Sequence, residues 1–173
     1  PKQQVIIDAK SGISGAGRNL NSEKLFSEGE DNFQAYKVQT HRHYPEMLQV
    51  INNNTDLDVL FVPHLSSMIR GIFTTLYIRM DYDNISELIT QYKLFYKKSP
   101  FVDVCDVDSF PKVSDVALTN SCKISLHKSV SDKGDINLVI FSVIDNLIKG
   151  ASGQAVQNMN IMFGLGEKTA LDF

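Results

Sequence analysis

The sequence predicts an α+β domain built on a mostly antiparallel or mixed sheet that is flanked by helices. Strand-like segments follow one another in runs and do not alternate regularly with helices, which is typical of this class. Residues 116–126 and 136–144 have the composition of strands, and the turn sequence Ser131-Asp132-Lys133-Gly134 between them predicts a hairpin. Helical periodicity is clear after Asn84 and again after Asp145.

Short segments rich in apolar, β-branched and aromatic residues predict the other strands. They cover residues 5–7, 35–39, 59–62, 69–80 and 102–105. The first of them leads into a glycine-containing loop at residues 11–18, and residues 19–34 are polar and expected to be irregular.

Three helices are expected. Pro45 suits the first turn of a helix that ends near Asn52, because proline lacks the N–H that would be unpaired there. Asn84 caps the second helix, with Glu87 three residues on as in a capping box. The apolar face of this helix consists of Ile85, Leu88, Ile89, Tyr92 and Tyr96. Ser152 is the expected N-cap of the third helix. Its apolar stripe is most simply explained by core packing and consists of Ala155, Val156, Met159, Met162 and Phe163.

The composition is that of one globular domain. The chain has 173 residues, 43% hydrophobic and 21% charged, which is enough for one sizeable core. A net charge of −3 gives no basic field to attract nucleic acid or a membrane surface, and the apolar segments are too short to span a bilayer. Two cysteines cannot make a disulfide framework, which favours a reducing cytoplasm. Because the first residue is Pro1, we expect an internal piece of a longer polypeptide or a trimmed chain.

The first candidate site is the glycine loop. Gly12, Gly15 and Gly17 have the spacing GxxGxG, which is neither the dinucleotide fingerprint nor a P-loop. Such a loop after a strand can still bring backbone N–H groups close to an anion, and Arg18 adds a charged donor. A tight turn between strands is the alternative, and the spacing alone favours it.

The second candidate site is the segment His41-Arg42-His43 with Glu46. In an extended segment the two histidines point to the same side, and a histidine with a pKa near neutrality passes a proton in either direction. Glu46 is placed to orient an imidazole and to favour its charged form. A metal site is a weaker alternative, because no third ligand is evident, and histidines at a surface strand end are the other.

Arg70 begins an otherwise apolar segment, after His64, and needs a partner or water. A ligand carboxylate is one candidate, and an internal Asp or Glu is the more common one. The last helix carries four amides, which can bind ligands through hydrogen bonds: Gln154, Gln157, Asn158 and Asn160. Cys105 and Cys122 both fall in strand-like segments and are expected to be structural.

Several of these motifs together resemble the N-acetyl-gamma-glutamyl-phosphate reductases of the semialdehyde dehydrogenase superfamily. They are Ser11–Arg18, His41–Glu46, Pro63–Leu65 with Met68–Gly71, Thr119–Cys122, and Ser142–Asn160. The resemblance spans residues 5 to 171. The HRHxPE segment and the last stretch are specific, whereas aspartate-semialdehyde dehydrogenases carry a similar glycine loop.

The resemblance implies a fold and a reaction. The fold is that of the C-terminal domain of enzymes similar to glyceraldehyde-3-phosphate dehydrogenase. The reaction is the NADPH-dependent reduction of N-acetyl-glutamyl 5-phosphate to N-acetyl-glutamate 5-semialdehyde, in arginine biosynthesis. In this family a cysteine attacks the carbonyl to form a thioester, and a histidine is the acid/base.

The resemblance also implies roles for individual residues. His41 is the first choice for the acid/base and His43 the second, with Glu46 orienting the imidazole. The expected substrate-binding residues are Arg42, Arg70, Ser14 and Arg18. The expected cofactor-side residues are Gly15, Ala16 and Gly17 of the glycine loop, with Gln157 and Asn158 near the nicotinamide.

The chain departs from the family decisively in one respect, because the family's Asn-Pro-Gly-Cys nucleophile segment is not in the sequence. A smaller departure is Ser66-Ser67, where family members tend to have a proline before the methionine. We therefore expect residues 1–150 to be a substrate-binding and dimerisation domain, and residues 151–173 to be a helix that docks on a separate dinucleotide-binding domain. The intact protein is expected to form a homodimer or homotetramer, and this chain alone to be inactive and not to bind NADP. A non-catalytic binding or dimerisation module is the alternative, and a standalone Cys–His enzyme is the least favoured.

Overall fold

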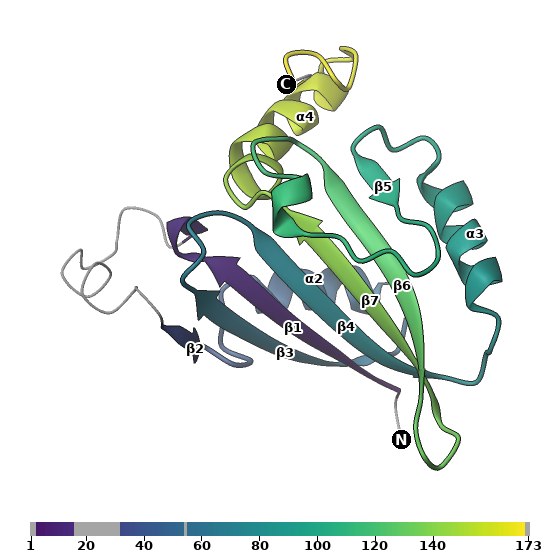
Figure 1. Cartoon of the computed structure of the whole chain (residues 1–173). Coiled ribbons are helices and arrows are strands. Elements are labelled where there is room, and N and C mark those ends of the chain that lie inside the picture. Colours follow the sequence, from purple (N-terminus) through teal and green to yellow (C-terminus); the bar gives the residue numbers. More distant parts are fainter. Residues whose placement is uncertain (1–2, 16–31, 54, 172–173) are drawn as a thin grey trace.

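The computed structural model describes residues 3–15, 32–53 and 55–171, which form one mixed seven-stranded sheet (Figure 1). The strand order is β2-β3-β1-β4-β7-β6-β5. The strands are β1 Gln4–Gly12, β2 Phe33–Ala35, β3 Asp58–Ser66, β4 Ile72–Met80, β5 Val102–Val104, β6 Cys122–Val130 and β7 Ile136–Ile144. The β1–β3 and β5–β6 pairs are parallel and the others antiparallel, so the predicted mixed sheet is confirmed.

Two helices cover one face of this sheet. Helix α2, Tyr44–Asn52, packs over β1 and β3, and α3, Ile85–Tyr96, packs over the β4, β6 and β7 side. Leu76 and Ile78 of β4 contact both apolar clusters and so join them into one core. The third helix, α4 Gly153–Met162, lies at the end of the sheet and follows a π-helical turn, η3 Ile148–Ser152 (Figure 1). Among the described residues, no helix is long and apolar enough to cross a membrane.

Helix α3 and the β6–β7 hairpin match their predictions closely. Asn84 Oδ1 accepts the backbone N–H of Glu87, as in the predicted capping box. The Glu87 carboxylate, however, accepts a hydrogen bond from the Asn84 side-chain amide and not from the Asn84 backbone N–H. The five predicted apolar residues of α3 all pack into the core. The hairpin turn closes through the N–H of Gly134 on the carbonyl of Ser131, at 2.9 Å.

Three predicted strands include residues where the backbone turns away from the sheet. The strand expected over residues 69–80 begins only at Ile72, and the strand expected over 35–39 is β2, which begins at Phe33, in the segment expected to be irregular. Residues 36–39 are not a strand, since Lys37 and Gln39 adopt positive φ angles of 46° and 57°. The Gln39 side-chain amide instead hydrogen-bonds the backbone of β3: it donates to the carbonyl of Val59 and accepts the N–H of Phe61. Residues 116–121 form turns, in which Leu118 has a φ of 62°, and the strand begins only at Cys122.

Helix α4 is oriented opposite to the prediction. Its apolar residues face outward, with Met162 80% and Phe163 75% exposed, whereas the amides of Gln157 and Asn160 are buried. Ser152 is the N-cap residue of α4, as predicted, but its hydroxyl donates to the carbonyl of Leu147 and caps no N–H of the helix. The buried amides are satisfied locally, since Asn160 donates to the carbonyls of Glu167 and Thr169.

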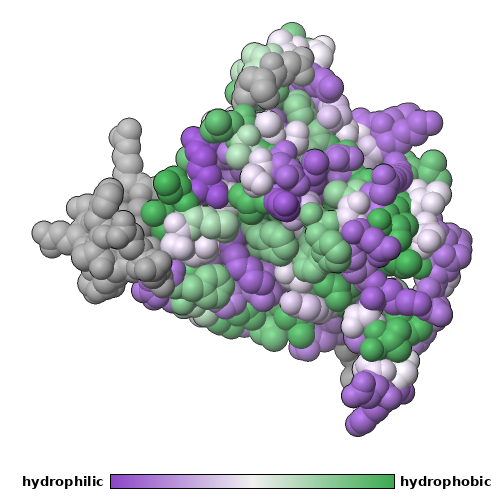
Figure 2. Space-filling model, viewed as in Figure 1, coloured by the Kyte–Doolittle hydropathy of each residue, from purple (hydrophilic) through white to green (hydrophobic). Residues whose placement is uncertain are grey.

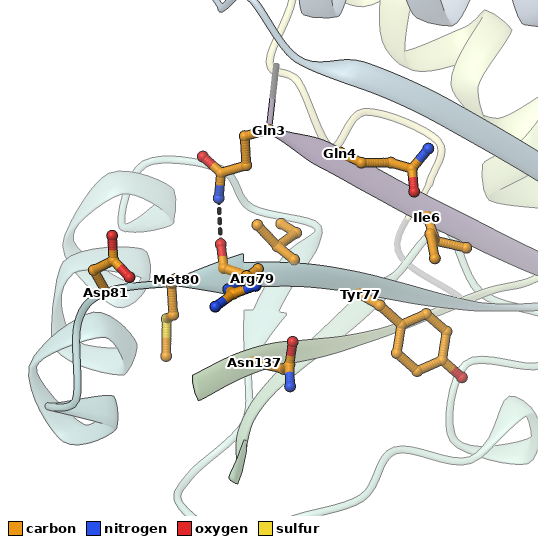
Figure 3. Close-up of a pocket in the computed structure, with 9 residues that line it drawn as sticks. Gln3, Gln4, Ile6, Tyr77, Arg79, Met80, Asp81 and Asn137 are labelled. Carbon is orange, nitrogen blue, oxygen red and sulfur yellow. Dashed lines mark hydrogen bonds between the residues drawn. The ribbon is translucent and has the colours of Figure 1, made fainter. Parts of the chain in front are cut away.

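The other face of the sheet, turned toward the viewer in Figure 1, is covered by neither α2 nor α3. Strand alternation places Ile6, Tyr77 and Phe141 on this face, and Figure 2 shows hydrophobic and polar side chains intermixed over it. At one end an open hollow is lined by Gln4, Ile6, Tyr77, Arg79 and Asn137 (Figure 3).

Candidate functional site

The start of the glycine loop is fixed against the segment that precedes β4. The N–H groups of Gly12, Ile13 and Ser14 donate to the carbonyls of Gly71, Met68 and Ile69, at 2.8, 2.8 and 3.2 Å. A Cβ on Gly12 would lie 2.8 Å from the Met68 carbonyl oxygen, so this close approach requires glycine. Ser14 and Arg70 are thereby brought to the same end of the sheet.

Arg70 is paired with Asp145, which directly follows β7. Arg70 Nη1 lies 3.0 Å from Asp145 Oδ2, and the carboxylate also accepts the N–H groups of Leu118, Leu147 and Ile148. The Asp145 side chain is 0% exposed, whereas that of Arg70 is 36% exposed. Burial by itself raises the pKa of Asp145, but these four hydrogen bonds outweigh it and hold the pKa below its usual range. The more common of the two partners expected for Arg70, an internal carboxylate, is therefore confirmed.

Asn146 connects the same end of the sheet to the glycine loop. Its Oδ1 accepts the N–H of Gly71 at 2.7 Å, and its Nδ2 donates to Ser14 Oγ at 2.9 Å. The residue is buried. Two consecutive residues thus hold the two predicted substrate-binding residues of this region, Arg70 through Asp145 and Ser14 through Asn146.

His41 belongs to a second group, beside α2. Its Nδ1 accepts the backbone N–H of His43 at 3.2 Å, and its Nε2 lies 3.5 Å from the Tyr36 hydroxyl. The segment is a turn and not extended, yet the rings of His41 and His43 still meet edge to face at 4.9 Å. Since Nδ1 accepts a hydrogen bond, the neutral ring carries its proton on Nε2.

The pKa of His41 is lowered. Burial is the largest cause, followed by the positive charges of His43, Arg42 and Lys37. Glu46 is not among the groups that shift this pKa, so its expected role in favouring the charged form is not supported. The imidazole is therefore neutral at pH 7 and able to take up a proton.

The remaining predicted residues are more dispersed. Gly15 lies against Ser11 and Asn146, whereas Ala16, Gly17 and Arg18 lie outside the described residues. Gln157 is buried, and its amide is engaged by Asn120, Lys149 and Glu167. Asn158 is exposed and bonded to Gln154. Within the described part of the chain, no hydrogen bond or ion pair joins the His41 group to the Arg70 group.

Other candidate chemistries find no support. Burial raises the pKa of the Cys122 thiol and, with help from Asp103, that of Cys105, so neither thiol is activated and the predicted structural role agrees. His64 lies 3.0 Å from Asp8 and stacks on Phe33, away from His41. The described residues contain no cluster of three or more His, Cys, Asp or Glu that could hold a metal ion.

Asp145 and Asn146 were not among the residues singled out from the sequence. Their signal is the Asp-Asn pair that directly follows the apolar strand 136–144, in a chain where Arg70 needs an internal partner. Only the topology, with β4 antiparallel to β7, places the start of one strand beside the end of the other.

Comparison with known proteins places the chain among dehydrogenases. Residues 1–146 match the family model described as semialdehyde dehydrogenase, dimerisation domain. N-acetyl-gamma-glutamyl-phosphate reductases from Pseudomonas syringae and Desulforamulus reducens are 48% and 49% identical, covering 97% and 98% of this chain but 48% and 49% of the relatives. The chain thus spans about half the length of these relatives.

Solved structures with this fold include aspartate semialdehyde dehydrogenase II from Vibrio cholerae, with a TM-score of 0.67 over 92% of this chain and 54% of that one. The aspartate semialdehyde dehydrogenase of Francisella tularensis gives a TM-score of 0.64 over 92% of this chain and 57% of that one. Sequence identity is 16% in both cases, so this likeness concerns the fold. Together with the match over residues 1–146, it leads to one conclusion: the chain belongs to the semialdehyde dehydrogenase dimerisation-domain family.

Proposed function

We propose that this chain is the substrate-binding and dimerisation half of an N-acetyl-gamma-glutamyl-phosphate reductase. The intact enzyme would reduce N-acetyl-glutamyl 5-phosphate to N-acetyl-glutamate 5-semialdehyde in the cytoplasm, with NADPH as cofactor. The observation that carries this proposal is the identity of nearly one half to reductases of that name, sustained along almost the whole chain. The groups of residues around His41 and around Arg70 are the proposed contributions of this chain to the reaction.

His41 is the proposed acid/base. A neutral imidazole takes a proton from an attacking thiol and, once protonated, returns one to an aldehyde oxygen, and positioned acid/base groups contribute about 10²–10⁴-fold to rate. In the tautomer with its proton on Nε2, the nitrogen that takes up a proton is Nδ1, so proton uptake would replace its hydrogen bond from the His43 N–H. His43 is the second choice, although its backbone N–H already serves to orient His41. Glu46 and Arg42 flank this turn, and Arg42 is the substrate cation proposed on this side.

Arg70 and Ser14 are the proposed anion-binding residues on the other side, with Arg18 completing the glycine loop. A guanidinium that is partly exposed while anchored at one nitrogen is suited to a carboxylate or a phosphate. These two groups would hold the substrate while the nucleophilic cysteine of the other half attacks.

NADPH would supply the hydride when bound in the intact enzyme. On the cofactor side, Gly15, Ala16 and Gly17 would let the loop backbone approach it closely, and Asn158 offers an exposed amide. Gln157 would act there only by exchanging its internal partners, because Asn120, Lys149 and Glu167 already engage its amide. This chain alone is therefore expected to bind NADP weakly or not at all.

Two surfaces would serve assembly. The open sheet face, with Ile6 and Tyr77 beside the hollow of Figure 3, would pair with a second copy of the chain in a homodimer or homotetramer. The exposed apolar residues of α4, namely Met159, Met162 and Phe163, would dock on the dinucleotide-binding half, in line with a role for residues 151–173 apart from residues 1–150. The relatives' doubled length gives room for that half.

The test is an assay of the full-length protein that contains this chain. NADPH oxidation is followed with N-acetyl-glutamyl phosphate and, in parallel, with aspartyl phosphate, and the isolated chain serves as control. We expect activity only with the full-length protein and the N-acetyl-glutamyl substrate. Preference for aspartyl phosphate would reassign the substrate, and full-length protein without activity on either would favour a non-catalytic dimerisation module.

A further inference from the structure

We propose that Asp145 and Asn146 are positioning residues that orient Arg70 and Ser14 toward one anionic group of the substrate. The inference rests on the proposed function for the identity of that anion, a carboxylate or a phosphate. The two donors approach from neighbouring backbone, because the N–H of Ser14 donates to the carbonyl of Ile69, the residue next to Arg70.

Asp145 fixes one side of the guanidinium and leaves the rest available. Its buried carboxylate is anchored by the N–H groups of Leu118, Leu147 and Ile148, at 2.8, 2.8 and 3.0 Å, so it cannot follow Arg70 if that side chain moves. A guanidinium has five N–H donors. In the described part of the chain, the bond from Nη1 to Asp145 is the one hydrogen bond that Arg70 makes, and its side chain is partly exposed. The remaining donors are thus presented to a ligand in a fixed orientation.

Asn146 fixes the role of the Ser14 hydroxyl. Its amide cannot be reversed, because Oδ1 must accept the N–H of Gly71, and this leaves Nδ2 to donate to Ser14 Oγ. A serine hydroxyl that accepts a hydrogen bond from the amide turns its own hydrogen elsewhere. Ser14 is therefore set as a donor, which is the role that an anion requires.

An aspartate at position 146 would reverse this arrangement. One carboxylate oxygen would still accept from Gly71, but the other would draw the Ser14 hydrogen toward itself and away from the ligand. Asn146→Asp thus removes the Ser14 donor with no change in side-chain shape. The variant also adds a negative charge, so it is compared with Ser14→Ala and with the double variant, whose non-additivity isolates the coupling.

The experiment measures kcat, the KM for the acyl phosphate, the KM for NADPH and inhibition by inorganic phosphate in the full-length protein. Asn146→Asp and Ser14→Ala are each expected to raise the substrate KM and the phosphate inhibition constant about tenfold, with little change in kcat or NADPH KM. In the double variant, the rise in substrate KM should be smaller than the product of the rises in the two single variants. Asp145→Asn should also raise the substrate KM, while Asp106→Asn, which removes an exposed ion pair with Lys93, should leave it unchanged.

The proposal is overturned if folded Asn146→Asp keeps the parent KM, or if the two single effects multiply in the double variant. It is also overturned if kcat falls and the NADPH KM rises together with the rise in substrate KM, since a general structural defect would do that. Calorimetric binding of inorganic phosphate to the same variants tests the anion site even if the proposed substrate is wrong. Parent protein that binds phosphate no better than Asn146→Asp and Ser14→Ala would contradict the inference.

Discussion

The backbone of Gly71 lies so close to Val113 that no β-carbon fits between them. A Cβ built on Gly71 would be 2.0 Å from Val113 Cγ1, and the φ angle of Gly71 is +106°, a region that side chains rarely adopt. This glycine sits between Arg70 and β4, and its N–H is held by Asn146. Its replacement therefore disturbs directly the end of the sheet proposed to bind an anion.

Gly71→Ala is expected to lower the free energy of unfolding by about 2–5 kcal/mol, because backbone strain and overpacking add at the same residue. The measurement is a urea titration. Gly134→Ala is the matched control, since its φ is also positive at +83° but no atom lies within 4 Å of the added Cβ. If both variants lost the same free energy of unfolding, the close contact between Gly71 and Val113 would contribute nothing to stability.

The buried amides of α4 make a second prediction. Asn160 is 1% exposed and bonds two backbone carbonyls, so Asn160→Ala should cost about 1–3 kcal/mol by leaving them unpaired. Asn158→Ala, on the exposed side of the same helix, should change stability by less than about 0.5 kcal/mol. If chemical unfolding ranked the two variants in the opposite order, the outward orientation of the apolar face would be wrong.

Asp145 should control acid stability. A carboxylate whose pKa is held down in the folded state stabilises the fold above its unfolded pKa of about 3.9, and this contribution is lost as pH falls through the folded pKa. Asp145→Asn should therefore lower the free energy of unfolding at pH 7 by about 1–3 kcal/mol, because an amide cannot accept all the hydrogen bonds that the buried carboxylate accepts. It should also flatten the fall in stability below about pH 4. Unfolding curves that stay parallel to those of the parent down to pH 2 would rule this out.

The lowered pKa of His41 predicts its titration. Removing a nearby positive charge with Lys37→Gln or Arg42→Gln should raise this pKa, whereas Lys133→Gln, in the exposed hairpin turn, should not. NMR titration of the imidazole from pH 4 to 8 measures the shift. Because the folded pKa lies below the unfolded value, the neutral ring favours the fold above about pH 6.5, and part of that stability is lost as pH falls below it. A His41 pKa at or above its ordinary value would contradict the burial seen in the structure.

Elements set by local signals were predictable from the sequence. The Asn84 cap, the apolar face of α3 and the Ser131–Gly134 turn depend on residues close in sequence, and all three are confirmed. Helix α4 was not, because its buried amides find partners in Glu167 and Thr169 beyond the helix. The apolar stripe of α4 predicted the buried side of the helix, but in this chain the stripe is exposed to solvent.

The site was predictable only in its separate parts. Arg70 needed a partner and Ser14 belonged to a glycine loop, but the residues that hold them lie 75 and 132 positions away in sequence. The pairing of β4 with β7 brings them together, and no local pattern encodes that pairing. The histidine pair was found for a partly wrong reason, since His41 and His43 meet across a turn and not along a strand.

The most direct test of the proposed acid/base half compares His41→Asn with His43→Asn in the full-length protein, by NADPH oxidation with N-acetyl-glutamyl phosphate. We expect His41→Asn to lower kcat by about 10²–10⁴-fold with little change in the substrate KM, and His43→Asn to lower it far less. A His41→Asn enzyme that keeps the parent kcat would contradict the assignment of the proton-transfer residue to this chain.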